Sequence, residues 1–295
     1  MRTAFIQQLV EEAKTNDKIF LIVGDLGYSV VEPFALAYPE RFLNAGVAEQ
    51  NMTGIAAGLA KEGYNVFTYS IGNFPTMRCF EQIRYDVCYH NLNVKIISVG
   101  GGYAYGPLGP SHHATEDIGT LRVLPNLTVC APSDPIEAKA ITSMFCNTNT
   151  PGYLRLGKAG EPNVHDSEID LKWGKGICVK KGEDTAVLSM GSIVFAMKKE
   201  LQDSKFGLYS FPFIKPFDKE LLQTIANSYS NIFTVEEHQK SGGFGSVVLE
   251  ALNDLREEGK IQQIPMVKRI AIPDIYISVA GSQEFLRNKA GLKLF

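Results

Sequence analysis

Short apolar runs and helix-like periods alternate along the whole chain. The runs KIFLIVGD (18–25), YNVFTYS (64–70) and VKIISVG (94–100) predict buried strands, whereas FIQQLVEEA (5–13) and AEQNMTGIAAGLAKEG (48–63) have helical periodicity. Apolar strands separated by helices of this length favour parallel βαβ units with helices on both faces of a sheet. The expected fold class is therefore α/β, doubly wound.

The pattern is interrupted once. After Gly157 the stretch KAGEPNVHDSEIDLKWGKG is polar and has no clear period, and the alternation of strands and helices then restarts. A length of 295 residues also favours two domains over one. We predict a first domain over residues 1–162, a linker over 163–182 and a smaller α/β domain over 183–295.

Composition narrows the functional classes. Apolar residues make up 45% and charged residues 21%, and the net charge is −3. This is typical of a globular protein with a sizeable core, and the lack of a basic patch argues against nucleic acid as a ligand. The five cysteines are scattered without a CxxC pair, so we expect neither zinc nor a disulfide framework. No run approaches membrane-spanning length and the N-terminus is no secretory signal, so the expected location is the cytoplasm.

Several unusual residues follow predicted strands. Ligands of open α/β sheets lie beyond the carboxyl ends of the strands. The loops at that edge carry Asp25, Ser29, Glu49, Phe74 and the adjacent pair His112–His113. These loops are therefore the first place to look for a site.

Glu49 begins a helix whose sequence is GVAEQNMTGIAAGLA. Taken alone, it could be a first-turn acid favoured by the helix dipole. However, the segment resembles the one that carries the catalytic glutamate in the pyrimidine-binding domain of transketolases, deoxyxylulose-phosphate synthases and 2-oxo acid dehydrogenase β subunits. The resemblance implies that Glu49 hydrogen-bonds the aminopyrimidine ring of thiamine diphosphate. That role needs a buried, protonated carboxyl within reach of the ring.

The segment FTYSIGNFPTMRCFEQIRYDV matches the family's R-aromatic-acid-Q-aliphatic-R run from Arg78 onward. Apolar residues spaced by three would also fit a core stripe. By the resemblance, Phe74 stacks on the aminopyrimidine, and Phe80, Arg78 and Asp25 are further candidates for cofactor binding. Met77 stands where typical transketolases have a second aromatic residue.

The loop GGGYAYGPLGPSHHATEDIG resembles the family's G-P-T-H-Q stretch. This implies that His112 is the catalytic histidine facing the sugar, because histidine suits proton transfer near neutrality. His113 stands where the family has glutamine, and we assign it to substrate binding. Leu108 replaces an aspartate that contacts a substrate hydroxyl, which suggests an unusual sugar. The dehydrogenase β subunits have A-Q-H-S here, so the transketolase branch is favoured.

Three further residues match substrate-phosphate contacts of the family. Arg2 precedes the first helix, Ser29 lies in GDLGYS, and Lys158 follows GYLRLG, three residues after Arg155. Each could equally be a surface charge or a loop cap. A lysine attracts phosphate without the bidentate geometry of arginine.

The resemblance covers about the second half of a full transketolase. The other half holds Mg²⁺ and the cofactor diphosphate through a G-D-G…N segment, which this chain lacks. The resemblance therefore implies a partner, an N-terminal transketolase subunit that holds the diphosphate and Mg²⁺. Two copies of each chain would form a heterotetramer, with homodimerisation of this chain and no metal ligand of its own.

We predict transfer of a two-carbon ketol unit from a ketose to an aldose. The alternatives are a 2-oxo acid dehydrogenase β subunit or another thiamine-dependent carboligase, a non-catalytic scaffold subunit, and a nucleotide-binding protein that uses GGFG (242–245) as an anion-binding turn. The run Glu236-Glu237-His238 could suggest a metal site, but consecutive residues of a strand point to opposite faces. We therefore predict no metal there.

Overall fold

The computed structural model describes all residues, 1–295, and contains two β-sheets. The first sheet has the strand order β10-β5-β6-β4-β3-β1-β2 and is parallel except for β10, which pairs antiparallel with β5. Its strands are β1 (Ile19–Val23), β2 (Phe42–Asn44), β3 (Asn65–Ile71), β4 (Val94–Val99), β5 (Thr128–Cys130), β6 (Gly152–Leu156) and β10 (Phe213–Lys215).

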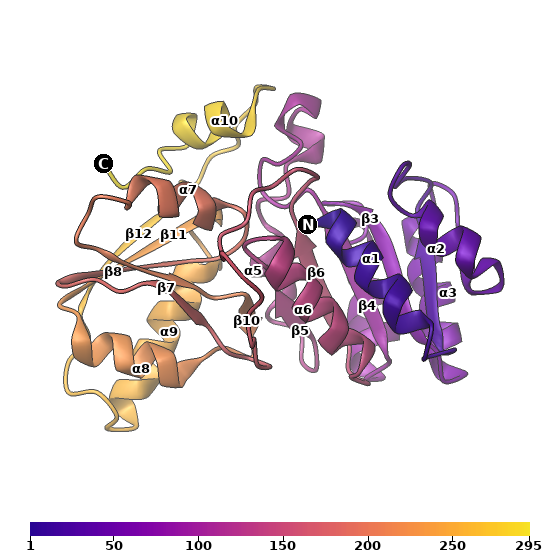
Figure 1. Ribbon diagram of the computed structural model, residues 1–295, viewed down its shortest axis with the longest axis horizontal. Coiled ribbons are helices and arrows are strands. Elements are labelled where there is room, and N and C mark those ends of the chain that lie inside the picture. The colour runs from indigo at the N-terminus through magenta and orange to yellow at the C-terminus, as the bar shows by residue number, and fades with distance from the viewer.

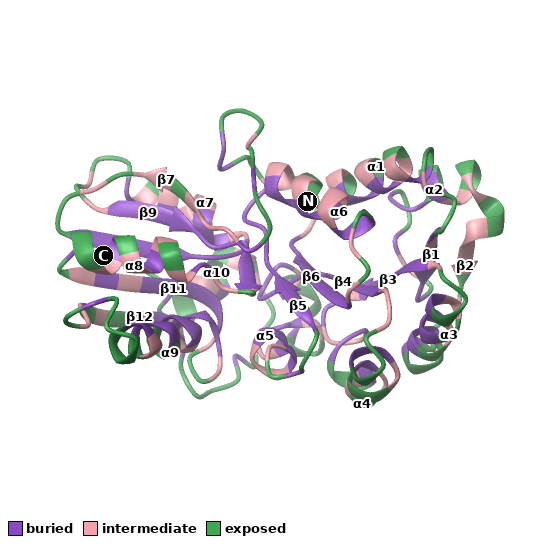
Figure 2. Ribbon diagram, turned by 90° about the horizontal axis from the view of Figure 1, so that it is seen from below, coloured by how far each residue is buried: buried purple, intermediate pink, exposed green.

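Helices cover both faces of the first sheet, as the alternation predicted (Figure 2). One face carries α1 (Arg2–Ala13), α2 (Glu32–Ala37) and α6 (Pro135–Cys146), and the other carries α3 (Glu49–Lys61), α4 (Phe80–Gln82) and α5 (Asp117–Leu121). The helix expected near residues 74–89 is built from three consecutive pieces, which are the 3₁₀ turn η2 (Met77–Cys79), α4 and the π-helix η3 (Ile83–Tyr89). The remaining 3₁₀ turns are η1 (Pro39–Arg41), η4 (Gly106–Leu108) and η5 (Pro110–His112).

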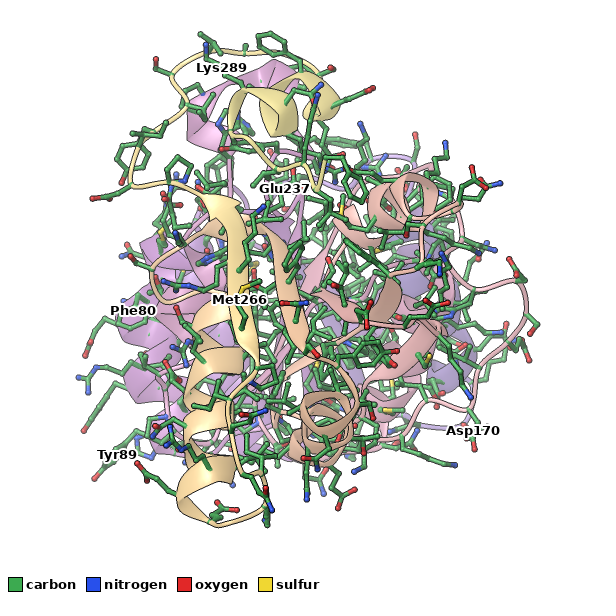
Figure 3. The ribbon with its side chains drawn as sticks, turned by 90° about the vertical axis from the view of Figure 1, so that its left-hand side faces the viewer. Phe80, Tyr89, Asp170, Glu237, Met266 and Lys289 are labelled. Atoms are coloured by element: carbon green, nitrogen blue, oxygen red, sulfur yellow. The ribbon has the colours of Figure 1, made fainter.

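The second sheet has the order β12-β11-β8-β9-β7, with β7 antiparallel at one edge. Its strands are β7 (Ile177–Lys180), β8 (Thr185–Ser189), β9 (Gly207–Ser210), β11 (Asn231–Gln239) and β12 (Met266–Ile272). Helices α7 (Ile193–Glu200) and α10 (Gln283–Lys289) lie on one side, and α8 (Lys219–Ser228) and α9 (Phe244–Glu257) on the other (Figure 1). Figure 3 looks onto this domain, with Met266 at the start of the edge strand β12. None of the chain's helices combines the length and apolar character needed to cross a membrane.

Local sequence explains where these elements begin and how they are buried. The side chains of Asp134, Asp218 and Ser282 accept hydrogen bonds from backbone N–H groups in the first turns of α6, α8 and α10, which satisfies donors that a helix start leaves unpaired. Every residue of β4 and β8 is buried. Such strands need near-continuous apolar runs, because helices cover both of their faces.

Two features of the domain junction differ from the sequence expectation. Residues 177–180, which we placed in the linker, form β7, because they pair with β9. Residues 213–215, which come from the second half of the chain, complete the first sheet as β10 by pairing with β5. The largest apolar cluster also contains residues of both halves, for example Leu121 and Phe244. The two sheets are thus joined by a continuous core.

Candidate active site

Glu49 lies in the first turn of α3 and is 2% exposed. Its Oε2 accepts a hydrogen bond of 2.7 Å from Nη1 of Arg78, whose side chain is 46% exposed. A buried carboxylate needs such a partner, and the N-terminus of a helix also favours an acid. Glu49 Oε1 has no hydrogen-bond partner in the chain. The carboxyl is thus buried under one long cationic side chain, with one oxygen free.

Phe74 joins this pair to a histidine. The guanidinium carbon of Arg78 lies 4.7 Å from the centroid of the Phe74 ring, a cation–π distance. The ring of His112 meets Phe74 edge-on, with centroids 5.4 Å apart and planes at 72°. His112 Nδ1 lies 3.0 Å from Ser111 Oγ, and its Nε2 is not hydrogen-bonded within the chain. Glu49, Arg78, Phe74 and His112 therefore form one group, which we call the ring-site group.

The two remaining residues of the aromatic segment lie apart from this group. Phe80 is partly buried and packs against the large core cluster shared by the two domains, as a core stripe would. Met77 is 36% exposed and lines a cavity at the domain junction. Of the two aromatic candidates, only Phe74 contacts the ring-site group.

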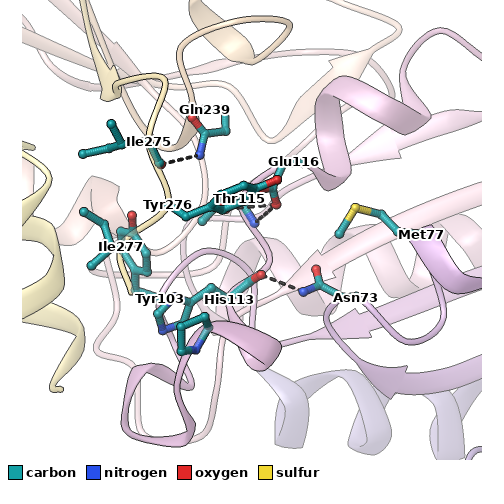
Figure 4. A pocket seen from close by; sticks show the side chains of 11 residues that line it. Asn73, Met77, Tyr103, His113, Thr115, Glu116, Gln239, Ile275, Tyr276 and Ile277 are labelled. Atoms are coloured by element: carbon teal, nitrogen blue, oxygen red, sulfur yellow. Dashed lines mark hydrogen bonds between the residues drawn. The ribbon is translucent and has the colours of Figure 1, made fainter. Parts of the chain in front are cut away.

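His113 faces the domain junction instead of the ring-site group. It is 6% exposed, its ring meets Tyr103 edge-on at 5.0 Å, and burial lowers the pKa of its imidazole. Its Nε2 is buried and has no hydrogen-bond partner. His113 lines a cavity of about 170 Å³, which we call the junction cavity (Figure 4). The adjacent histidines of the sequence thus serve two different environments.

Sequence reasoning missed the other polar residues of the junction cavity. They are Asn73, Thr115 and Glu116 of the first domain and Gln239 and Tyr276 of the second. Gln239 ends β11 and Tyr276 lies in the loop after β12. The rule that ligands lie beyond the carboxyl ends of strands, which we applied only to the first sheet, would have pointed to both.

Asp25 and Ser29 lie together in the loop after β1. Both are exposed and have positive φ angles, 53° and 62°. Asp25 Oδ1 accepts a hydrogen bond of 3.0 Å from Asn44 Nδ2, and the Ser29 N–H donates to Glu32 Oε1 at 2.7 Å. The loop therefore presents an acid to solvent, and the backbone N–H of Ser29, a donor that could hold an anion, is engaged by Glu32.

The basic candidates lie around the N-terminus. Arg2 lies near the hydroxyl of Tyr105, and its buried Nε has no hydrogen-bond partner. The backbone N–H of Lys158 donates to Glu161 Oε1 at 2.6 Å, and Glu161 Oε2 also pairs with the N-terminal ammonium at 2.8 Å. One carboxylate thus competes with any phosphate for this cluster.

Two other residues behave as their chemistry requires. Leu108 is 55% exposed at the end of η4, so it offers an apolar contact where the family has an acid. Arg155 is buried and forms an ion pair of 2.8 Å with Asp117, so it is a structural residue and does not bind phosphate. Gly54 and Gly58 lie on the exposed side of α3, with open space over each.

The glycines before α9 do not form an open anion site. Glu236 Oε2 accepts from the N–H of Phe244 at 2.6 Å, and Oε1 accepts from the N–H of Gly245 at 2.8 Å. The helix start is therefore already occupied by a carboxylate, which removes the basis for the nucleotide-binding alternative. Glu237 points the other way, toward Tyr103 and Arg287, as the strand alternation predicted.

Glu236 should make stability depend on pH. Burial raises the pKa of its carboxyl from 4.5 to about 7. In that window the folded chain holds a proton that the unfolded chain has released, so the free energy of unfolding falls as pH rises. We expect urea denaturation to show a loss of at most about 3 kcal/mol from this group. In Glu236→Gln that part of the slope should disappear, and an unchanged slope would contradict the assignment.

Comparison with known proteins agrees with this geometry. The family model for the transketolase pyrimidine-binding domain matches residues 1–160, and the model for the transketolase C-terminal domain matches residues 174–292. One of the two subunits of the apulose-4-phosphate transketolase of Actinobacillus succinogenes is 32% identical and aligns with 97% of this chain and 92% of its own length. A putative transketolase C-terminal section from Methanocaldococcus jannaschii is 33% identical, with 97% and 90% covered.

Solved structures give the same result. The structure described as a split gene transketolase, inactive beta4 tetramer, superimposes with a TM-score of 0.84 at 35% identity and covers 99% of this chain and 93% of that one. The transketolase of Leishmania mexicana has the same fold, with a TM-score of 0.81 at 20% identity, and this chain spans 43% of it. The chain therefore belongs to the transketolase family and consists of its pyrimidine-binding and C-terminal domains.

Proposed function

We propose that the chain is one subunit of a split transketolase that transfers a two-carbon ketol unit from a ketose to an aldose with thiamine diphosphate. The observation that carries the proposal is the ring-site group, in which a buried carboxyl, an aromatic ring and a histidine adjoin one another. The names of two relatives, each a single subunit of an apulose-4-phosphate transketolase, support the division into two chains.

The residues present fit the pyrimidine half of the cofactor. Glu49 offers a buried carboxyl with a free Oε1, and Phe74 offers an aromatic ring beside it. When bound, thiamine diphosphate supplies the electron sink for breaking and forming the carbon–carbon bond. Arg78 now lies over both Glu49 and Phe74, so it has to move aside or share the carboxylate when a ring approaches.

The roles of the chain's own residues follow from their positions. Glu49 holds a proton at its carboxyl, hydrogen-bonds the ring nitrogen and fixes the orientation of the ring. Phe74 packs against the ring face, and His112 exchanges a proton with the sugar oxygens through its unpaired Nε2. The partner chain holds the diphosphate and Mg²⁺, because this chain has no G-D-G…N segment.

Reconstitution tests the proposal. The chain is mixed with a partner that carries the G-D-G…N segment, thiamine diphosphate, Mg²⁺, a ketose phosphate donor and an aldose phosphate acceptor. We expect turnover from the pair and none from either chain alone. Pyruvate replaces the ketose in a second reaction, because deoxyxylulose-phosphate synthases are also relatives, for example that of Clostridium perfringens at 33% identity.

Three results would contradict the proposal. Turnover by this chain alone would remove the need for a partner. Consumption of pyruvate in place of the ketose would assign the chain to another thiamine enzyme. Full activity after changing both Glu49 and His112 would make the chain a scaffold subunit.

A further inference from the structure

The junction cavity adjoins the ring-site group without being part of it. Asn73 and His113 line the cavity, and their chain neighbours Phe74 and His112 belong to the ring-site group. Asn73 Nδ2 donates a hydrogen bond of 2.7 Å to the carbonyl oxygen of His113, which ties the two loops together. Whatever occupies the cavity therefore lies next to the residues expected to handle the sugar.

The polar atoms of the cavity are not satisfied by the protein. His113 Nε2 and Asn73 Oδ1 are buried and have no hydrogen-bond partner. Leaving such an atom unpaired costs about 1–3 kcal/mol, so a ligand that pairs with it gains that much. One atom is a ring nitrogen and the other a carbonyl oxygen, so together they suit hydroxyl groups, which both donate and accept.

The charges around the cavity exclude a phosphate. None of its 11 lining residues is a lysine or an arginine, and one is an acid, Glu116. Burial raises the pKa of the Glu116 carboxyl, which makes a nearby anion still less favourable. Ile275, Tyr276 and Ile277 supply an apolar wall, a common lining for the carbon face of a small ligand. A volume of about 170 Å³ suits a single small ring or a short polyol.

The walls are fixed before any ligand binds. The Tyr103 N–H donates to Glu237 Oε1 at 2.7 Å, and Glu237 Oε2 is paired with Arg287 at 2.7 Å. Gln239 Nε2 donates to the carbonyl oxygen of Ile275 at 3.3 Å. The second domain thus holds both a wall residue of the first domain and its own loop in place.

From these observations we propose that the junction cavity binds an uncharged, hydroxyl-bearing part of the sugar substrate, and that the C-terminal domain thereby contributes to substrate choice. The ligand's identity as substrate rests on the proposed transketolase function. Its chemistry, neutral and polyhydroxylated, rests on the cavity itself. Phosphate groups of a substrate would have to be held elsewhere.

Saturation-transfer NMR on the full chain tests this, with D-ribose and D-ribose 5-phosphate as a matched pair. We expect saturable binding of D-ribose and weaker binding of the phosphate ester. His113→Phe keeps a ring against Tyr103 and removes Nε2, and Tyr276→Ala removes an exposed wall that is 81% accessible. Each should weaken D-ribose binding about tenfold. Tyr89→Ala, an exposed aromatic outside the cavity, is the control and should have no effect.

Several outcomes would overturn the inference. They are no saturable D-ribose signal, equal binding by wild type and both cavity variants, or tighter binding of the phosphate ester. The measurement needs neither partner nor cofactor. A failed transfer reaction therefore counts against the proposed function, whereas a failed titration counts against the cavity.

Discussion

Glu49→Gln should lower kcat of the reconstituted pair by about 10²- to 10⁴-fold, the usual contribution of a positioned acid or base. The substitution keeps the size of the side chain and leaves an amide oxygen that can still accept from Arg78. It removes the ionisable proton. A large loss of kcat with little change in the sugar KM would therefore indicate lost proton chemistry and not lost folding.

The measurement has two parts. The first is kcat and KM of the pair at saturating thiamine diphosphate and Mg²⁺, and the second is the rate at which the C2 proton of the bound cofactor exchanges with solvent. Both rates should fall together in Glu49→Gln. Glu62→Gln, an exposed acid just after the other end of α3, is the matched control and should retain both. Unchanged proton exchange in Glu49→Gln would show that this carboxyl has no part in activating the cofactor.

The sequence predicted the members of the ring-site group better than its geometry. Glu49, Phe74 and His112 could be grouped in advance, because they follow strands whose carboxyl ends meet at one edge of the sheet. The contact of Arg78 with both Glu49 and Phe74 could not, since it depends on how the irregular turn after β3 folds back over α3. A long cationic side chain reaches several partners, and sequence spacing does not select among them.

Adjacent residues gave the clearest limit. His112 ends η5 and contacts Phe74, whereas His113 adopts an extended backbone and turns toward Tyr103. A change of backbone conformation between two neighbours separates their side chains, and no pattern of residues encodes it locally. The strand β10 was missed for a related reason. Three residues carry no usable period, and this strand exists because it pairs with β5 of the other domain.

Asp117→Ala should lower the free energy of unfolding by about 3–5 kcal/mol, the usual loss when one partner of a buried ion pair is removed. Asp117 is fully buried and Oδ2 accepts from Arg155 Nε at 2.8 Å. Arg155 Nη2 also donates to the carbonyl oxygens of Ala114, next to His113, and of Glu237 in the second domain. Without Asp117 this arginine would remain buried between the domains without a counter-charge.

Urea denaturation monitored by circular dichroism measures the loss. Glu168→Ala removes an exposed ion pair with Lys139 and should leave the urea midpoint nearly unchanged, because solvent screens such pairs. The double variant Asp117→Leu with Arg155→Met removes both charges and should recover much of the lost stability, since the main penalty is the uncompensated cation. If Asp117→Ala costs no more than Glu168→Ala, the ion pair does not hold the loop of His113 against the second domain. If the double variant is as unstable as Asp117→Ala, the loss lies in the hydrogen bonds of Arg155 to the two loops and not in its charge.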